Sequence, residues 1–229
     1  AVAAELGLPV VDADAMRRAF PQIEMTVFTL AGIGATPMSL ADEKGNAVVL
    51  KATTNQMAER LARAAVVQLG MTAGVSCYPM MARQVAAHAV LGSLTFCMEL
   101  GRRLSAVQRG VPGAYEEFLD VAEGRLIFEG KIIDIDRRST DGFARGTVVL
   151  EHLTDLDRTL RVEIQNELLM AFEDGRPVVT TPDLICMLDH EYAVPITTEA
   201  LAYGQRVDVI GMPCAPKWNQ PGFLDIVGP

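Results

Sequence analysis

From Arg125 onward the chain is a series of short strand patterns separated by turn residues, and this series limits the possible folds more than any other feature. Turn signals occur at Thr140-Asp141-Gly142, Asp174-Gly175 and Tyr203-Gly204. Short strands with regular turns are typical of a β-rich domain. The pattern predicts strands at 126–128, 131–136, 145–151, 159–168, 177–181, 184–188 and 206–212.

Residues 1–124 alternate strand patterns with helix patterns instead. Thr54 is a good N-cap for a helix that Gly70 ends, and Pro21 stops a shorter one. We therefore expect an α/β fold class, with an N-terminal α/β domain over 1–124 and a β-rich C-terminal domain over 125–229. The predicted strands are 8–12, 24–30, 47–51 and 75–78, and the predicted helices are 14–20, 54–69, 82–91, 93–108 and 114–122.

The first seven residues read like the last turns of a helix that Gly7 closes. A domain seldom begins inside a helix. We therefore expect that the first domain is incomplete at its N-terminus and that upstream sequence belongs to it.

Charge and hydropathy exclude several classes of partner. The chain carries 20 basic and 29 acidic residues, a net charge of −9, and such a surface repels nucleic-acid phosphates. No stretch approaches the roughly 20 apolar residues of a membrane-spanning helix. The four cysteines are scattered without a CxxC pair, a usage typical of a reduced cytoplasmic protein. We expect no nucleic-acid or membrane partner.

Asp12 and Asp14 follow a predicted strand, at the edge where open α/β sheets bind ligands. Two carboxylates there could hold a metal, act in acid/base chemistry, or bind a ligand amide N–H. Alternatively they form a turn, with Asp14 as the N-cap of the next helix. Arg18 lies four residues after Asp14, so on a helix the two would form an ion pair.

Gln165-Asn166-Glu167 interrupts an otherwise apolar strand. Buried polar groups must be paired or functional, because an unpaired one costs ~1–3 kcal/mol. Asn166 and Glu167 therefore either bind a polar ligand or belong to a hydrogen-bond network between the domains. Asp42, Gly45 and Asn46 form an acidic turn, for which a plain hairpin is the simpler interpretation.

No histidine belongs to a set with known zinc spacing. Asp189-His190-Glu191 could bind a cation, but it reads better as an exposed turn. The sequence therefore predicts no metal and no other cofactor.

Several segments, in order along nearly the whole chain, resemble the S-methyl thiohydantoin desulfurase-like family, long classed as domain of unknown function 917 and associated with hydantoinase and oxoprolinase proteins. Members of that family look longer, with an upstream glycine-rich segment. The segments that carry the resemblance are 10–21, 41–46, 78–80, 142–147, 165–167, 181–185, 203–207 and 213–218.

The resemblance implies two domains with a small cyclic amide or thiohydantoin bound in the cleft between them. It suggests a hydrolase in which Asp12 or Asp14 is the base and Arg18 a donor to the substrate. Asn166 and Glu167 would recognise the polar ring of the substrate, and Asp42 and Asn46 would shape the pocket. The alternative is a non-catalytic accessory or binding subunit of a hydantoinase/oxoprolinase-type system. A homo-oligomer is also expected.

Overall fold

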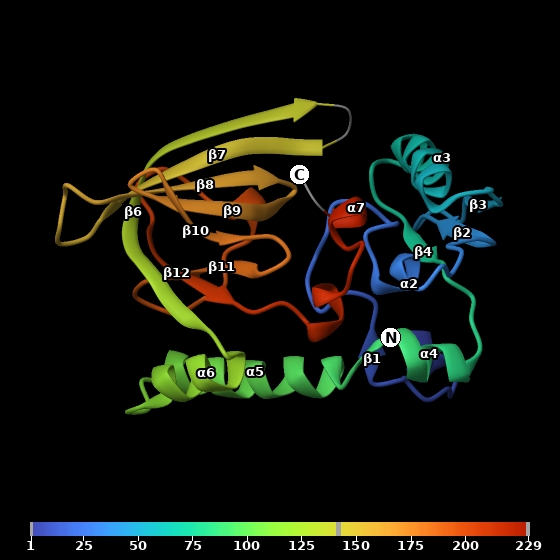
Figure 1. Ribbon diagram of the computed structural model, residues 1–229, viewed down its shortest axis with the longest axis horizontal. Coiled ribbons are helices and arrows are strands. Elements are labelled where there is room, and N and C mark those ends of the chain that lie inside the picture. The colour runs from blue at the N-terminus through green and yellow to red at the C-terminus, as the bar shows by residue number, and fades with distance from the viewer. Residues whose placement is uncertain (1, 141–142, 228–229) are drawn as a thin grey trace.

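The computed structural model describes residues 2–140 and 143–227, so Asp141 and Gly142 of one predicted turn lie outside it. The chain has a mixed α/β fold (Figure 1). Helices and short strands make up its first half, and a large curled antiparallel sheet makes up most of its second half. The predicted fold class is confirmed.

The large sheet has seven strands in the order β10-β9-β8-β7-β6-β12-β11, and every neighbouring pair is antiparallel. It curls until β11 packs beside β9 and β10 (Figure 1). Its strands are β6 (Arg125–Thr140), β7 (Phe143–His152), β8 (Thr159–Gln165), β9 (Glu167–Glu173), β10 (Arg176–Thr180), β11 (Leu184–Asp189) and β12 (Arg206–Met212).

The alternation of apolar and polar residues explains the curl. In β8, Leu160, Val162 and Ile164 point inward and are buried, while the residues between them face outward. Phe128 and Val209 from other strands join them in one core enclosed by the sheet. Burying one face of every strand favours closing the sheet on itself.

The predicted helices at 54–69, 82–91, 93–108 and 114–122 are confirmed within a few residues. Thr54 caps α3 as expected, because its side chain accepts a hydrogen bond from the Met57 amide. The main elements of this half are α3 (Asn55–Gln68), α4 (Ala82–His88), α5 (Ser93–Gln108), α6 (Ala114–Ala122), and the small sheet of β2 (Met38–Ala41), β3 (Ala47–Leu50) and β4 (Gly74–Ser76).

The chain before β2 differs from the prediction. Helix α1 (Val2–Glu5) ends near Gly7 as expected, but residues 8–12 form no strand and are exposed. Only β1 (Ala13–Asp14) forms, paired with β5 (Val90–Leu91), and 15–20 is not helical. The helix α2 (Val27–Leu30) replaces the predicted strand at 24–30.

The C-terminal segment returns to the first half of the chain (Figure 1). Trp218, in the 3-10 helix η2 (Pro216–Asn219), is fully buried, and its indole N–H donates to the carbonyl oxygen of Met16 at 2.9 Å. Its ring meets that of Phe20 edge-on, with centroids 5.1 Å apart. Short α7 (Leu224–Val227) packs into the same core. The end of the chain thus packs with residues on the other side of the predicted domain boundary at 124/125, and that boundary stays a prediction.

Among the residues that the structure describes, no helix combines the length and apolar character needed to cross a membrane.

Candidate functional site

A cavity of about 310 Å³ lies where β9 and β11 approach each other, and the segment before α2 closes one side of it. The loop that ends in the 3-10 helix η1 (Thr198–Ala200) forms another wall. We call it the Arg18 cavity. It is lined by Arg18, Ala19, Glu167, Leu168, Leu184, Ile185, Cys186, Met187, Pro195, Ile196, Thr197, Thr198 and Glu199.

Arg18 is fixed by carbonyl oxygens that lie far away in the sequence. Its Nη1 donates to the carbonyls of Pro182 at 2.9 Å and Asp183 at 2.7 Å, in the turn between β10 and β11. A longer contact of 3.5 Å joins its Nη2 to the carbonyl of Leu168. The guanidinium also stacks on Phe20, 4.3 Å from the ring centroid. The predicted pair with Asp14 is therefore replaced by backbone contacts to the large sheet.

Burial lowers the pKa of Arg18 to about 10, while Glu167 opposes that shift. The side chain is thus still charged at pH 7 and brings a positive charge to the cavity wall. Its longest contact is made by Nη2, which leaves this nitrogen the best placed to donate to a ligand.

Glu167 is the first residue of β9, and only Asn166 separates it from the end of β8. Asn166 has a φ of 55°, a left-handed conformation that Asn tolerates better than most residues. Its carbonyl accepts a hydrogen bond from the Thr198 hydroxyl at 2.6 Å. The polar tripeptide is therefore a tight turn, and the predicted strand at 159–168 is confirmed only as far as Gln165, because the chain reverses at Asn166 into β9.

Two glutamates line the Arg18 cavity in different environments. Burial raises the pKa of Glu167, and the charge of Arg18 only partly opposes this. A hydrogen bond from its own backbone lowers the pKa of Glu199, helped by the hydroxyls of Thr197 and Thr198. One carboxyl thus retains its proton to higher pH than the other.

Cys186 also lines the cavity, and burial raises the pKa of its thiol. A thiol that resists ionisation is a poor nucleophile. Cys186 therefore serves the cavity as an apolar wall.

Asp12 and Asp14 do not line the Arg18 cavity. The Asp12 carboxylate accepts hydrogen bonds from the amides of Leu94 and Thr95 and from the Thr95 hydroxyl, which lowers its pKa. It thus caps the N-terminus of α5 from a distant part of the chain. Asp14 accepts from the amides of Met16 and Arg17, as in the turn alternative.

Asp42 and Asn46 lie in the turn between β2 and β3 and do not line the cavity either. The Asp42 carboxylate accepts from the amides of Lys44 and Asn46, and from the Asn46 side chain at 2.6 Å. These bonds lower the pKa of Asp42 and build the hairpin turn.

Of the seven predicted site residues, the structure brings Arg18 and Glu167 together in one cavity. Asn166 lies beside it, where its carbonyl accepts a hydrogen bond from Thr198 of the cavity wall. Sequence reasoning missed Glu199 and Cys186. A polar run, Thr197-Thr198-Glu199, was the one available signal, and nothing local connects it to Glu167.

Two family models together match the whole chain. The model described as "S-Me-THD-like, N-terminal domain" matches residues 1–52, and "S-Me-THD-like, C-terminal domain" matches residues 53–229. None of the curated proteins matches.

A crystal structure of a protein from Chromobacterium violaceum is similar to this chain. The two share 28% sequence identity with a TM-score of 0.76, and the match covers 98% of this chain. The chain spans 64% of the length of that crystallised protein.

Proposed function

Because the chain belongs to the S-Me-THD-like family, we propose that it hydrolyses a small cyclic amide or thiohydantoin bound in the Arg18 cavity. The volume of about 310 Å³ is at the small end of the range for ligand sites and suits a single ring. Apolar residues of β11 would cover the ring, and Arg18 would donate to its carbonyl oxygen.

The observation that carries the proposal is the opposite pKa shift of Glu167 and Glu199 within one cavity. Two titratable groups whose environments separate their pKa values are the usual basis for assigning an acid and a base. Glu167 would be the general acid and Glu199 the general base. Asp12 and Asp14, the catalytic candidates from the sequence, are left out because they hold a helix end and a turn.

For an S-methyl thiohydantoin the reaction runs in two steps. Water adds to the ring carbon that carries sulfur, while its proton passes through Glu199 to the ring nitrogen. The C–S bond then breaks, Glu167 protonates the departing sulfur, and methanethiol leaves. The proton of the new hydroxyl returns to Glu167 as the ring carbonyl forms. Arg18 stabilises negative charge on the other carbonyl oxygen throughout.

Release of methanethiol from S-methyl thiohydantoin tests this assignment. We expect Glu167→Gln to lower kcat by about 10²–10⁴-fold with the thermal midpoint unchanged, since general acid catalysis contributes that much. Glu199→Gln should have a comparable effect and remove the acidic limb of the pH profile. Glu43→Gln, at the tip of the β2–β3 hairpin, is the control and should behave as wild type. Full activity in Glu167→Gln would refute the proposed roles.

A second candidate is a binding or accessory subunit of a hydantoinase/oxoprolinase-type system. Apolar residues before β1 favour it, because Leu6, Leu8, Val10 and Val11 are about three-fifths exposed and could contact another chain. In that case the purified protein would bind the thiohydantoin, measured by calorimetry, and release no methanethiol.

A second copy of the chain is the other partner we propose for this exposed apolar surface, and sedimentation at several concentrations tests it.

A further inference from the structure

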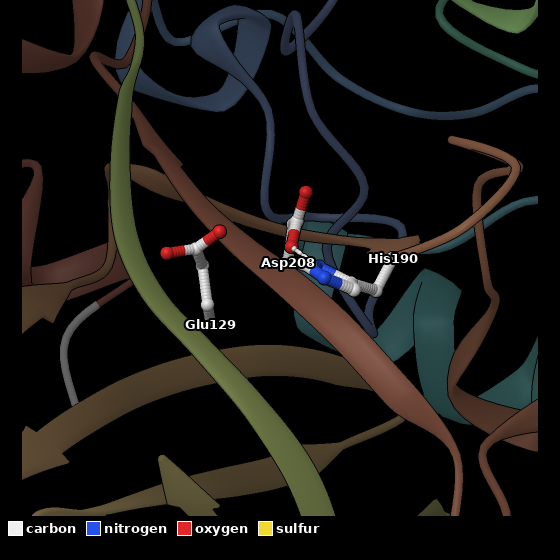
Figure 2. A group of neighbouring side chains, drawn as sticks. All are labelled: Glu129, His190 and Asp208. Carbon is white, nitrogen blue, oxygen red and sulfur yellow. Dashed lines mark hydrogen bonds and ion pairs between the residues drawn. The ribbon is translucent and has the colours of Figure 1, made fainter. Parts of the chain in front are cut away.

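Three side chains with metal-ligating atoms converge outside the Arg18 cavity (Figure 2). Glu129 lies on β6, Asp208 on β12, and His190 directly after β11. The candidate ligand atoms, two carboxylate oxygens and an imidazole nitrogen, all lie within 4.8 Å of one another. The set joins three parts of the chain that only the folded sheet brings together.

Glu129 and Asp208 are directly opposite each other in the antiparallel pair of β6 and β12. Like charges at such positions destabilise a sheet. Asp208 is 8% exposed, so water screens this repulsion poorly. A cation between the two carboxylates would convert this unfavourable pair into a favourable one.

Asp208 is already oriented by its neighbours. Its Oδ1 lies 2.6 Å from Nδ1 of His190, and its Oδ2 accepts a hydrogen bond from the Tyr115 hydroxyl of α6 at 3.2 Å. A hydroxyl that holds a carboxylate in place is a common partner of a metal ligand.

The carboxylate of Glu129 is less constrained than that of Asp208. Within residues 2–140 and 143–227, its carboxylate makes no hydrogen bond or ion pair, and it is half-buried. The nearby cation Arg206 is occupied by Glu191, at 2.7 Å. Glu129 is therefore free to turn toward a bound ion.

We propose that Glu129, His190 and Asp208 bind one divalent transition-metal ion of the Zn²⁺ type. One nitrogen and two carboxylate oxygens form a donor set that zinc accepts, with a fourth position for water. Tetrahedral bonds of about 2.0–2.2 Å place neighbouring ligand atoms about 3.3–3.6 Å apart. Ligand atoms that lie within 4.8 Å reach this spacing by side-chain rotation, without movement of the strands.

The site lies between the sheet and α6, on which Tyr115 stands. A metal there would fasten the turn after β11 to β6 and β12, so we expect it to stabilise the fold. The proposal departs from the sequence prediction of no metal, which considered only the spacing of ligands along the chain.

Titration of the metal-free full chain with ZnCl₂ tests the proposal by calorimetry and thermal unfolding. We expect one equivalent to bind and to raise the unfolding midpoint, because the ion binds only the folded site. Glu129→Gln and His190→Gln should each weaken binding by at least about a hundredfold and abolish the zinc-dependent rise. Without zinc, Glu129→Gln should be as stable as wild type or more stable, since it removes the like-charge pair.

Glu43→Gln is the control, because it removes the same charge from the turn between β2 and β3, an element that carries none of the three ligands. It should bind zinc as wild type does. Cobalt in place of zinc distinguishes thiolate binding at a cysteine, which gives an intense near-ultraviolet band, from the proposed nitrogen and oxygen ligands. The proposal fails if no equivalent binds, if Glu129→Gln binds zinc as tightly as wild type, or if the cobalt spectrum shows thiolate.

Discussion

Nη1 of Arg18 lies 2.7 Å from the carbonyl oxygen of Asp183, a residue 165 positions later in the sequence. The same nitrogen donates to Pro182, and the Asp183 carboxylate accepts from the amide of Cys214 at 2.9 Å. One turn of the large sheet thus holds both the segment before α2 and the segment after β12. Arg18 is therefore a structural clamp as well as a wall of the cavity.

We predict that Arg18→Gln lowers the free energy of unfolding by about 2 kcal/mol, since hydrogen bonds to charged groups contribute that order of stability. Urea denaturation measures the change. Arg102→Gln is the control: its side chain is 67% exposed and pairs with Glu99 at the surface, so the loss should stay below about 0.5 kcal/mol. Equal losses in the two variants would contradict the role of Arg18 as a clamp.

Local sequence patterns predicted most of the helices and most strands of the large sheet. They succeeded where one apolar face recurs regularly, as in β8 and α3. They failed at 8–12, because those apolar residues stay exposed instead of pairing as a strand. They failed at 14–20, because the Asp14 turn and contacts of Met16 and Phe20 with Trp218 hold that segment in a non-helical conformation. They also missed the chain reversal at Asn166. Its left-handed conformation cannot be recognised from the sequence, where Asn166 is only a polar residue within an apolar run.

The candidate site was predicted in part. Arg18 and Glu167 belong to distinctive segments, so the resemblance was enough to select them. Asp12 was selected for the same reason, yet its partners Leu94 and Thr95 lie on a helix that no local pattern connects to it. Glu199 and the set of Glu129, His190 and Asp208 depend on how the sheet curls, which the sequence of a single chain does not reveal.

Asp12→Ala is predicted to destabilise the protein at neutral pH, because it removes the cap of α5. The folded pKa of Asp12 is lowered from 3.8, so its contribution is present above that pH and is lost as the pH falls through the lowered value. Thermal unfolding of wild type and variant should therefore differ at pH 7 and converge in strong acid. Methanethiol release per folded molecule should be unchanged. A variant that is as stable as wild type but inactive would restore Asp12 as the catalytic base.

Glu24 gives the opposite dependence on pH. Burial raises its pKa above 4.5, and its Oε2 has no hydrogen-bond partner within the described part of the chain. The folded protein therefore binds this proton more tightly than the unfolded chain, and stability falls as the pH rises through the interval between the two pKa values. Glu24→Gln should remove that loss. We expect it to be more stable than wild type at pH 7 and to lose this advantage below pH 4.5 in the same thermal assay.

The last prediction compares two glycines. A Cβ atom at Gly146, in β7, would collide with the backbone carbonyl oxygen of Asp136 on the neighbouring β6, whereas one at Gly101, in α5, would meet nothing within 4 Å. Gly146→Ala should therefore force β6 and β7 apart and cost at least about 3 kcal/mol, an overpacking effect that flexible side chains cannot absorb. Gly101→Ala should instead stabilise the protein by about 1 kcal/mol, because alanine favours the helix. Urea denaturation of both variants measures the difference, and a Gly146→Ala protein as stable as wild type would show that the two strands are not this close.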